Sequence, residues 1–460
     1  MHINKLRLGW TAALAALVAT ALSFSATAEQ VRLGAAMGQP TILVGDAQKG
    51  YLRISLTGMK LPKESRRTPV NLAIVLDKSG SMTGEKIANA KAAAIKAVSM
   101  LQPDDIVSIV AYDDTVKVLV PATKVADRDY IFAGIERIQA GGNTALFAGV
   151  SKGAAEVRKF HSRNRVNRVI LLSDGLANVG PSSPGDLAEL GTSLIREGIS
   201  VTTIGLGLDY NEDLMTKLAQ KSDGNHMFAE KASDLEWIFA RELGDVLSVV
   251  AQDIEITIEC HGGIRPIRIL GRDAEIVGQR VTTIMNQLYS DQVKYVFLEV
   301  ELPATFDRIK LVVAQSGTGG PELQVADVRV RFNNTLTQRE VTDSAPVFVE
   351  LTNSPETVEK RTNAAVMASV IEQIGVERNI AAVQLRDEGK VEEARQALVS
   401  NTVFLIENAE KYDSESLRAY SVKNKLAEEN LDDDSWRHQR KVMKEEQHAI
   451  TNQQRATGKP

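Results

Sequence analysis

Residues 70–82, which read VNLAIVLDKSGSM, decide the fold of this chain of 460 residues. The apolar run at residues 72–76 ends abruptly in Asp77, and Ser79 and Ser81 follow it on either side of a glycine. A short apolar run that stops at turn residues is typical of a buried strand in a parallel sheet. Ligands of open α/β sheets bind in the crevice beyond the carboxyl ends of such strands. The acid and the two hydroxyls therefore mark this strand end as a candidate binding site.

Strand-like and helix-like segments alternate from residue 70 to about residue 249. Because strands that alternate with helices favour parallel pairing, this part predicts a doubly wound, mainly parallel α/β sheet. We expect its strands at residues 71–76, 106–112, 116–120, 168–173, 200–206 and 226–229. We expect its helices at residues 85–101, 128–138, 145–160, 184–197, 212–221 and 232–247.

The chain changes character after residue 249, where short β-rich runs are separated by glycines and prolines. This pattern predicts an antiparallel β-sandwich. The strand-like pieces that precede the α/β part are too short to fold alone, so we expect them to join the sandwich. Helices follow, and then a charged tail that we expect to be a solvated or frayed helix. The predicted order is signal peptide, N-terminal strands, α/β domain, sandwich, helical hairpin region and charged tail, at residues 1–28, 29–69, 70–249, 250–350, 351–412 and 413–460.

The first 28 residues predict a secretory signal peptide. Lys5 and Arg7 precede an apolar stretch, and the small residues Ala-Thr-Ala at 26–28 match a cleavage site. An uncleaved membrane anchor is the alternative interpretation. No later stretch of the sequence is long and apolar enough to span a bilayer. We therefore expect an exported protein with no transmembrane segment apart from this leader.

Composition sets further limits on the class of protein. A hydrophobic content of 43% with 25% charged residues is typical of a globular chain. Cys260 is the single cysteine, so no internal disulfide can form and stability must come from packed cores or bound ions. We expect Cys260 to be a buried strand residue. A net charge of −5 gives no support for nucleic-acid binding, which needs a basic face.

Two further segments carry oxygen ligands that match those of the first. Residues 141–145, GGNTA, form a glycine-rich loop with the hydroxyl of Thr144, and residues 170–175, ILLSDG, form a buried strand that ends in Asp174. In a doubly wound sheet these loops emerge on one edge. Oxygen-only ligands suit a hard divalent cation, and five oxygens from three loops leave one coordination position free. In the alternative interpretation Asp77 merely caps the following helix, which explains one segment and not the other two.

The sequence DKSGS at residues 77–81 is followed, in order, by the patterns G-G-x-T-x-L and L-L-S-D-G-x-x-N-x-G. Together these motifs resemble the metal-ion-dependent adhesion site of von Willebrand factor A domains, over about residues 70–245. The resemblance implies that an acidic side chain of a partner protein takes the open coordination position. It also implies a set of metal ligands, some of which act through water: Asp77, Ser79, Ser81, Thr144 and Asp174.

The whole layout also resembles exported bacterial proteins in which strands flank this domain and helices follow it. The resemblance implies a protein of the bacterial envelope, either periplasmic or secreted. We expect it to bind another protein in adhesion or assembly, through an Asp or Glu of that partner. Mg²⁺ is the expected ion, with Mn²⁺ and Ca²⁺ as alternatives, because all three prefer oxygen ligands.

We expect no enzyme activity. The chain has no G-x-S-x-G motif, no P-loop and no G-x-G-x-x-G after a strand. A metal-assisted hydrolase would need a general base near the open coordination position, and no motif offers one. A structural subunit of an envelope complex, whose metal stabilises the fold alone, is the other alternative.

Five more residues lie near predicted strand ends and have two interpretations each. We expect His226 to be a surface or packing residue rather than a metal ligand. Asp113, Asp114 and Asp209 either cap turns, which we favour, or form an acidic rim around the site. Met82 either contacts a ligand or is buried.

Overall fold

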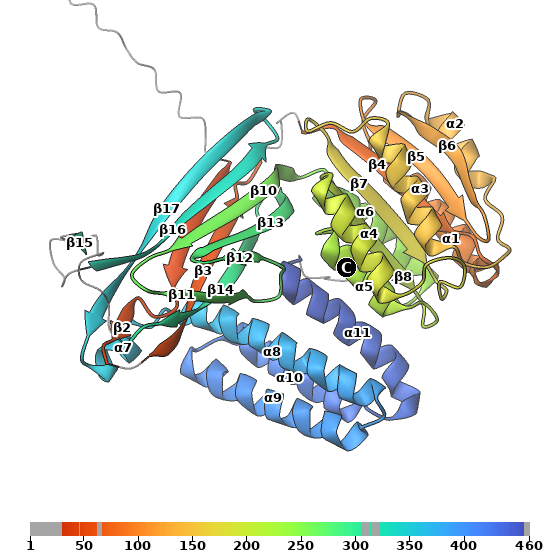
Figure 1. Cartoon of the computed structure of the whole chain (residues 1–460). Helices are drawn as coiled ribbons and strands as arrows, with labels where there is room; N and C mark the ends of the chain where they lie inside the picture. The colour runs from red at the N-terminus through yellow and green to blue at the C-terminus, as the bar shows by residue number, and fades with distance from the viewer. Residues whose placement is uncertain (1–29, 46, 62–66, 305–312, 315–321, 455–460) are drawn as a thin grey trace, which may run out of the picture.

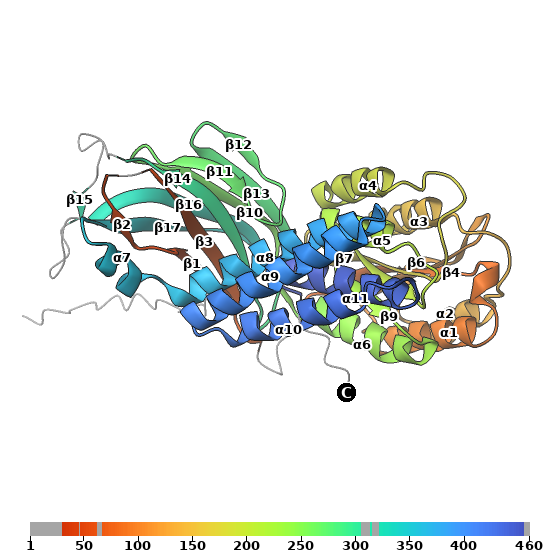
Figure 2. The ribbon, with the colours of Figure 1, turned by 90° about the horizontal axis from the view of Figure 1, so that it is seen from below.

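The computed structural model describes residues 30–45, 47–61, 67–304, 313–314 and 322–454, and the expected signal peptide lies outside them. These residues form an α/β part, a pair of mainly antiparallel sheets and a layer of C-terminal helices (Figure 1). The helical layer runs along the junction between the other two parts (Figure 1 and Figure 2). None of the helices in this described part combines the length and the apolar character that crossing a membrane requires.

The α/β part is built on a six-stranded sheet with the strand order β6-β5-β4-β7-β8-β9. Its strands are β4 (Val70–Asp77), β5 (Ile106–Tyr112), β6 (Val116–Lys124), β7 (Val166–Ser173), β8 (Ile199–Leu206) and β9 (His226–Ala229). β4 is buried along its whole length and is parallel to both neighbours, as its uninterrupted apolar run predicts. β6 pairs with β5 in the antiparallel sense at one edge. The prediction of a doubly wound, mainly parallel sheet is confirmed.

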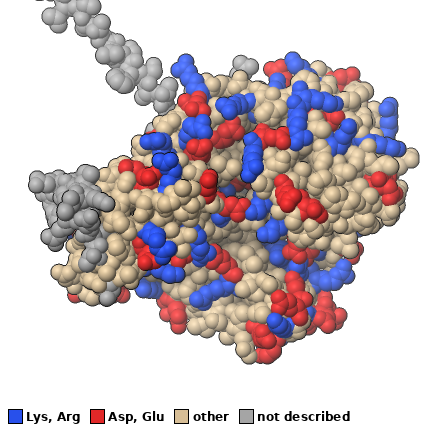
Figure 3. Space-filling model, in the orientation of Figure 1, with Lys and Arg blue, Asp and Glu red and all other residues tan. Residues whose placement is uncertain are grey.

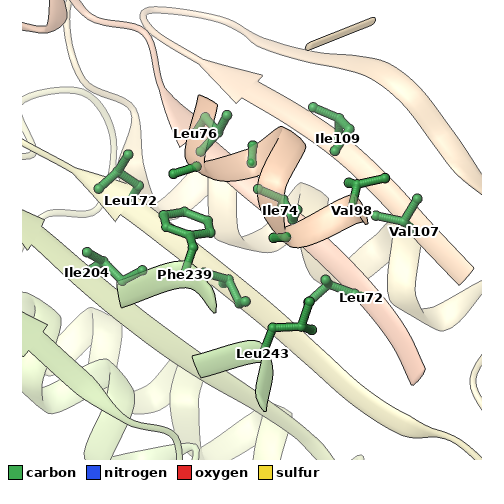
Figure 4. Close-up of a cluster of buried hydrophobic side chains, with 14 of the residues drawn as sticks. Leu72, Ile74, Leu76, Val98, Val107, Ile109, Leu172, Ile204, Phe239 and Leu243 are labelled. Atoms are coloured by element: carbon green, nitrogen blue, oxygen red, sulfur yellow. The ribbon is translucent and has the colours of Figure 1, made fainter. Parts of the chain in front are cut away.

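Helices cover both faces of this sheet (Figure 2). They are η1 (Gly80–Met82), α1 (Glu85–Ser99), α2 (Arg128–Glu136), α3 (Leu146–Arg158), α4 (Pro184–Arg196), α5 (Glu212–Lys221), η2 (Ala232–Asp234) and α6 (Leu235–Val246). Successive side chains of a strand point to opposite faces. Leu72, Ile74 and Leu76 accordingly pack in the core beneath α1 and α6 (Figure 4), whereas Ala73 and Val75 pack in the core beneath α3. β4 is therefore fixed from both sides, which holds the residue at its carboxyl end in place.

Two mainly antiparallel sheets lie beside the α/β part, in which β2 and β17 form the parallel pair. One has the order β1-β3-β14-β11 and the other the order β12-β13-β10-β16-β17-β2, with β15 against β16. Their strands are β1 (Val31–Met37), β2 (Thr41–Leu43), β3 (Gln48–Gly58), β10 (Val249–Cys260), β11 (Arg265–Ile269), β12 (Glu275–Val277), β13 (Arg280–Tyr289), β14 (Val293–Leu302), β15 (Val313–Ala314), β16 (Glu322–Asn334) and β17 (Arg339–Thr352). Strands from before the α/β part thus pair with strands from after it, because β3 lies against β14 and β2 against β17. The α/β part is inserted between strands of these two sheets.

The C-terminal part consists of helices that pack on one another. They are α7 (Pro355–Arg361), α8 (Ala364–Asp387), α9 (Val391–Lys411), α10 (Glu415–Glu429) and α11 (Asp433–Asn452). α8 is one uninterrupted helix of 24 residues. Asn379 is buried there and its side-chain amide donates to Asn424 of α10, so the polar residue serves packing between helices.

The expectation of a solvated or frayed tail is wrong for α11. Trp436, Met443 and His448 of this helix are buried, and His448 lies against the backbone oxygen of Gly224 at 3.0 Å. α11 packs on α8 and also on α5 and β9 of the α/β part. Its charges face acids that lie more than 200 residues earlier in the chain, and local composition carries no sign of such partners. The charged tail is therefore a structural element.

A buried ionic cluster joins the α/β part to the sheets. The carboxylate of Asp223 accepts from Arg272 at 2.8 Å, from Lys294 at 3.1 Å and from the backbone N–H of Asn286 at 2.7 Å. Burial alone would raise the pKa of Asp223, but Lys294 and Arg272 hold that pKa well below its usual value. Burial lowers the pKa of Lys294 to about 8 although Asp223 opposes the shift. This cluster fixes the two parts against each other.

The outer surface has a different character. Figure 3 shows lysine and arginine side chains interspersed with aspartate and glutamate over the visible face, without a large area of one sign. This distribution agrees with the weak net charge of −5. A basic stripe of the kind that binds nucleic acid is not visible on this face.

Candidate metal centre

Asp77 is the last residue of β4, and its side chain is fully buried. Its Oδ1 accepts a hydrogen bond from the backbone N–H of Ser79 at 2.8 Å, and its Oδ2 accepts from the hydroxyl of Ser173 at 2.6 Å. Tyr112 also directs its hydroxyl at Oδ2, at 3.4 Å. Burial raises the pKa of Asp77, the hydrogen bonds from Ser173 and Ser79 oppose that rise, and the charge of Asp174 adds to it. The carboxylate is thus held in one orientation at the carboxyl edge of the sheet.

Backbone hydrogen bonds join the first two loops of the predicted site. The N–H of Gly141 donates to the backbone oxygen of Lys78 at 2.7 Å, and the N–H of Gly80 donates to the backbone oxygen of Gly142 at 2.9 Å. Gly142 has a φ of +84°, a conformation that glycine adopts without strain. The loop after β4 and the loop before α3 therefore lie edge to edge.

The third loop, after β7, is attached to the second by Asn178. Its side-chain oxygen accepts from the backbone N–H of Thr144 at 2.8 Å, and its backbone N–H donates to the backbone oxygen of Thr144 at 3.2 Å. Asn178 is the asparagine of the motif L-L-S-D-G-x-x-N-x-G. The motif marked this residue, but only the structure shows that it holds the loop of Thr144. All three loops are thereby fixed relative to one another.

Side-chain oxygens of the three loops lie close together. The Oγ atoms of Ser79 and Ser81 are 3.1 Å apart, and Ser81 donates to Oδ1 of Asp174 at 2.7 Å. A β-carbon at Gly175 would lie 3.2 Å from Oγ1 of Thr144, 3.4 Å from Oγ of Ser81 and 3.9 Å from Oγ of Ser79. The absence of a side chain at Gly175 thus leaves a small space bordered by hydroxyl oxygens. The structure brings all five predicted ligands together.

Lys86 belongs to this site although no sequence pattern indicated it. It lies in the first turn of α1, and its Nζ is 2.5 Å from Oδ2 of Asp174. The side chain of Lys86 is 33% exposed, whereas that of Asp174 is fully buried. The charges of Asp77, Asp174 and Lys86 leave one net negative charge at the strand edge.

The donor set fits a divalent cation. Two buried carboxylates and three hydroxyl oxygens are hard oxygen ligands, the type that Mg²⁺, Mn²⁺ and Ca²⁺ prefer. The described residues contain no group of three or more histidine, cysteine, aspartate or glutamate side chains that could hold a metal, and at the end of β4 three hydroxyl groups accompany the two carboxylates. The hydroxyl-rich site at the end of β4 is therefore the position where the chemistry of this chain suits such an ion.

The acids at neighbouring strand ends have structural partners. Asp113 forms an ion pair with Lys78 and accepts from the backbone N–H of Thr115 at 2.8 Å. Asp114 accepts from the backbone N–H of Asn143 at 3.1 Å, so it braces the loop that carries Thr144. Asp113 caps its turn, the interpretation that we favour from the sequence, whereas Asp114 contacts a different loop at the rim of the site. Asp209 instead pairs across to α11, 2.7 Å from Arg437.

Met82, His226 and Cys260 have roles in packing. Met82 is buried in the core beneath α1 and α6. His226 is buried, and its Nδ1 lies 2.9 Å from the hydroxyl of Thr203. Cys260 ends β10 as a buried free thiol, and burial raises its pKa to about 12. None of the three takes part in the candidate metal centre.

A cleft of about 870 Å³ opens directly at the candidate metal centre. Ser79, Ser81 and Thr144 line it, together with residues 208–213, between β8 and α5. Residues of α8 and α11 also line it: Asp387, Trp436, Arg437, Arg440 and Lys441. The charged C-terminal helix thus forms a wall beside the metal site.

The sheet, the strand-edge site and the sequence motifs define a class of domain. The family model of the von Willebrand factor type A domain matches residues 71–241, so the chain contains such a domain. Domains of this class generally mediate protein–protein interactions, and they often bind a divalent metal. These properties belong to the domain class, and the matched residues are about two fifths of this chain.

Individual relatives are similar over larger parts of the chain. An uncharacterized protein of Synechocystis, sll0103, is 28% identical over 267 residues, which cover 52% of this chain and 62% of that protein. The structure resembles a von Willebrand factor type A protein from Catenulispora acidiphila, with a TM-score of 0.66 and 17% identity, over 86% of this chain and 91% of the other. It also resembles VWA2, an ArnB paralog from Sulfolobus acidocaldarius, with a TM-score of 0.62 and 17% identity, over 92% and 98%. Both solved structures share the fold well beyond the α/β part.

Proposed function

We propose that this protein is an exported binding module that engages an acidic group of a partner protein through a divalent cation, in adhesion or assembly at a bacterial envelope. The observation that carries the proposal is the cluster of five oxygen-bearing side chains: the hydroxyls of Ser79, Ser81 and Thr144 border the space beside Gly175. Asp77 is hydrogen-bonded to the backbone N–H of Ser79, and Asp174 to the hydroxyl of Ser81. Mg²⁺ is the proposed ion, with Mn²⁺ and Ca²⁺ as alternatives. The leader-like residues 1–28 support export to the periplasm or the medium.

The charge of the site supports an acidic ligand. Asp77 and Asp174 carry two negative charges, and Lys86 neutralises one of them. A bound dication would change the net charge of the site from −1 to +1. A carboxylate of a partner would then restore neutrality, so metal and acidic ligand are expected to bind cooperatively. The bound cation supplies a Lewis-acidic coordination position, and the protein supplies the hydroxyl and carboxylate oxygens that orient it.

The acids in the cleft favour binding over hydrolysis. Each of them that the structure describes is already held by a cation of α11: Asp209, Glu212, Asp213 and Asp387. Burial would raise the pKa of Asp213, but Lys444 and Arg440 lower it below its usual value. A general base needs the opposite shift, towards neutral pH. We therefore propose that the protein is not an enzyme.

The test compares wild type with Asp77→Ala in two measurements on the full chain. In a Mn²⁺ titration with Mg²⁺ as competitor, wild type should bind one ion and Asp77→Ala should bind none. In a pull-down from the native envelope, wild type should retain a partner in Mg²⁺ and release it in excess chelator. Asp273→Ala is the control, because Asp273 is an exposed acid that pairs with Lys221 far from the strand edge.

Partner binding that persists in Asp77→Ala, or in excess chelator, would refute the proposal. A melting temperature that rises with Mg²⁺, without any metal-dependent partner, would favour the structural subunit instead. Circular dichroism of Asp77→Ala must match that of wild type, so that loss of binding reports on the site and not on unfolding.

A further inference from the structure

The second wall of the metal-site cleft is part of a rigid framework. Arg440 of α11 forms ion pairs with Glu212 and with Asp213 of α5, the latter at 2.6 Å, and with Asp387 at the end of α8, at 2.7 Å. Lys441 is buried and donates to Glu212 at 2.5 Å and to the backbone oxygen of Tyr210 at 3.0 Å. Three elements that are distant in sequence are thereby joined. The cleft therefore exists before any ligand arrives.

Two of the residues that line the cleft are exposed leucines. Leu176 follows the loop of Asp174 and is 59% exposed, and Leu208 follows β8 and is 38% exposed. Both line the cleft that the metal loops and α11 also line. An exposed leucine in a preformed cleft is available to bury against an apolar group of a ligand, at about 25 cal/mol per Å².

The guanidinium group of Arg437, on α11, also lines the cleft. Arg437 lies one turn before Lys441 on α11 and is 62% exposed. It donates to Asp209 at 2.7 Å and to the backbone oxygen of Leu208 at 3.1 Å. Asp209 is itself 68% exposed, and pairs at such sites contribute about 0–1 kcal/mol. Arg437 can therefore exchange Asp209 for a carboxylate of a ligand at little cost.

We propose that this cleft receives an extended acidic segment of a partner protein. One carboxylate of the segment takes the open metal position, an apolar side chain lies on Leu176 and Leu208, and a second carboxylate pairs with Arg437. The wall formed by α11 beside the metal loops disfavours a broad, flat protein surface. This inference rests on the proposed function and adds the chemistry of the ligand and the residues that select it.

The probe for the test is an array of decapeptides with one fixed central aspartate and all other positions varied. The full chain is applied in Mn²⁺, in Mg²⁺ and in excess chelator. Wild type should select peptides with an apolar residue near the central aspartate and a second acid at a fixed spacing from it. Arg437→Glu should lose the preference for the second acid and bind the selected peptides at least about tenfold more weakly.

Two further variants complete the comparison. Leu176→Asp should lose the apolar preference, and Mn²⁺ titration should give the same affinity for both cleft variants as for wild type. Arg418→Glu is the matched control, because Arg418 is also an exposed arginine of the helical layer in a pair with an exposed aspartate, Asp413. It does not line the cleft and should leave peptide selection unchanged.

The outcomes separate this inference from the proposed function. Metal-dependent binding that requires the central aspartate but is unaffected by Arg437→Glu and Leu176→Asp would overturn the inference and leave the proposed function standing. No peptide bound under any condition would overturn the inference alone, because a folded partner protein could still present its acid to the metal. Binding that ignores the metal would overturn both.

Discussion

Replacement of Lys86 by methionine should strengthen metal binding and weaken binding of the acidic ligand. Lys86 contacts Asp174 at 2.5 Å and is one third exposed, so its charge acts on the site through partly solvated surroundings. The variant keeps the volume of the side chain and removes one positive charge. The site would then carry two negative charges before the metal binds and none afterwards.

Coulomb's law gives the size of the effect. A unit charge and a dication about 5 Å apart repel each other by about 2 kcal/mol at an effective dielectric constant of about 60, which suits a partly exposed group. Loss of this repulsion corresponds to an increase in metal affinity of about thirtyfold. The ligand's carboxylate would lose about 1 kcal/mol, or about fivefold in affinity, by the same reasoning. The metal-free variant should be less stable by about 1–3 kcal/mol, because Asp174 stays buried without its cation.

Isothermal titration with Mn²⁺ at low and high ionic strength measures the increase in metal affinity of Lys86→Met. The difference in Mn²⁺ affinity between wild type and this variant should become smaller as the salt concentration rises. Lys91→Met is the matched control, because Lys91 lies on the same helix, pairs with Glu136 and is 20% exposed. It should bind Mn²⁺ as wild type does. An affinity of Lys86→Met equal to or below that of wild type would refute the charge argument.

Three other predictions follow from single contacts. Gly175→Ala should weaken Mn²⁺ binding by more than about tenfold in the same titration, because its β-carbon would lie 3.2 Å from Oγ1 of Thr144; wild-type affinity would contradict the proposed geometry. Burial lowers the pKa of His448 to about 4, so its contribution to stability is complete above pH 6.5 and is lost between about pH 6.5 and 4. This loss amounts to about 3 kcal/mol in urea unfolding and should be absent in His448→Gln. Asp223→Asn should destabilise the fold by about 3–5 kcal/mol, and a second substitution, Lys294→Met, should restore part of that loss; an unchanged melting temperature in Asp223→Asn would refute the role of the cluster.

The sequence predicted the buried strand before Asp77 and the five candidate metal ligands, because residues close together in the chain determine both. The uninterrupted apolar run before Asp77 identifies a buried parallel strand because such a strand must be apolar on both faces. The five predicted ligands lie at the ends of strands and the starts of helices, where the topology of a doubly wound sheet brings them to one edge. The structure places all five together.

The sequence did not predict that Lys86 belongs to the candidate metal centre or that α11 is packed against the α/β part. The physical reason is the same for both. A charged side chain is expected to lie in solvent unless an oppositely charged partner is known. The partner of Lys86, Asp174, lies 88 residues away in the chain. The partners that Arg440 and Lys441 have in α5 lie still further away in the chain, and Asp387 of α8 is 53 residues from Arg440. α11 is very polar overall because its buried contacts are ionic as well as apolar, so its composition suggested a solvated or frayed tail.

The course of β4 has a mechanical consequence. The strand begins where the chain leaves the antiparallel sheets and ends at Asp77, so its axis points from that anchorage towards the candidate metal centre. A force applied to a ligand bound there would act along the axis of β4. The neighbouring strands β5 and β7 are parallel to β4 and paired with it along its length. The backbone hydrogen bonds on both sides would then be strained in shear, all at once, instead of opening one after another. A strand in this position is suited to carry tension between a bound partner and the rest of the molecule.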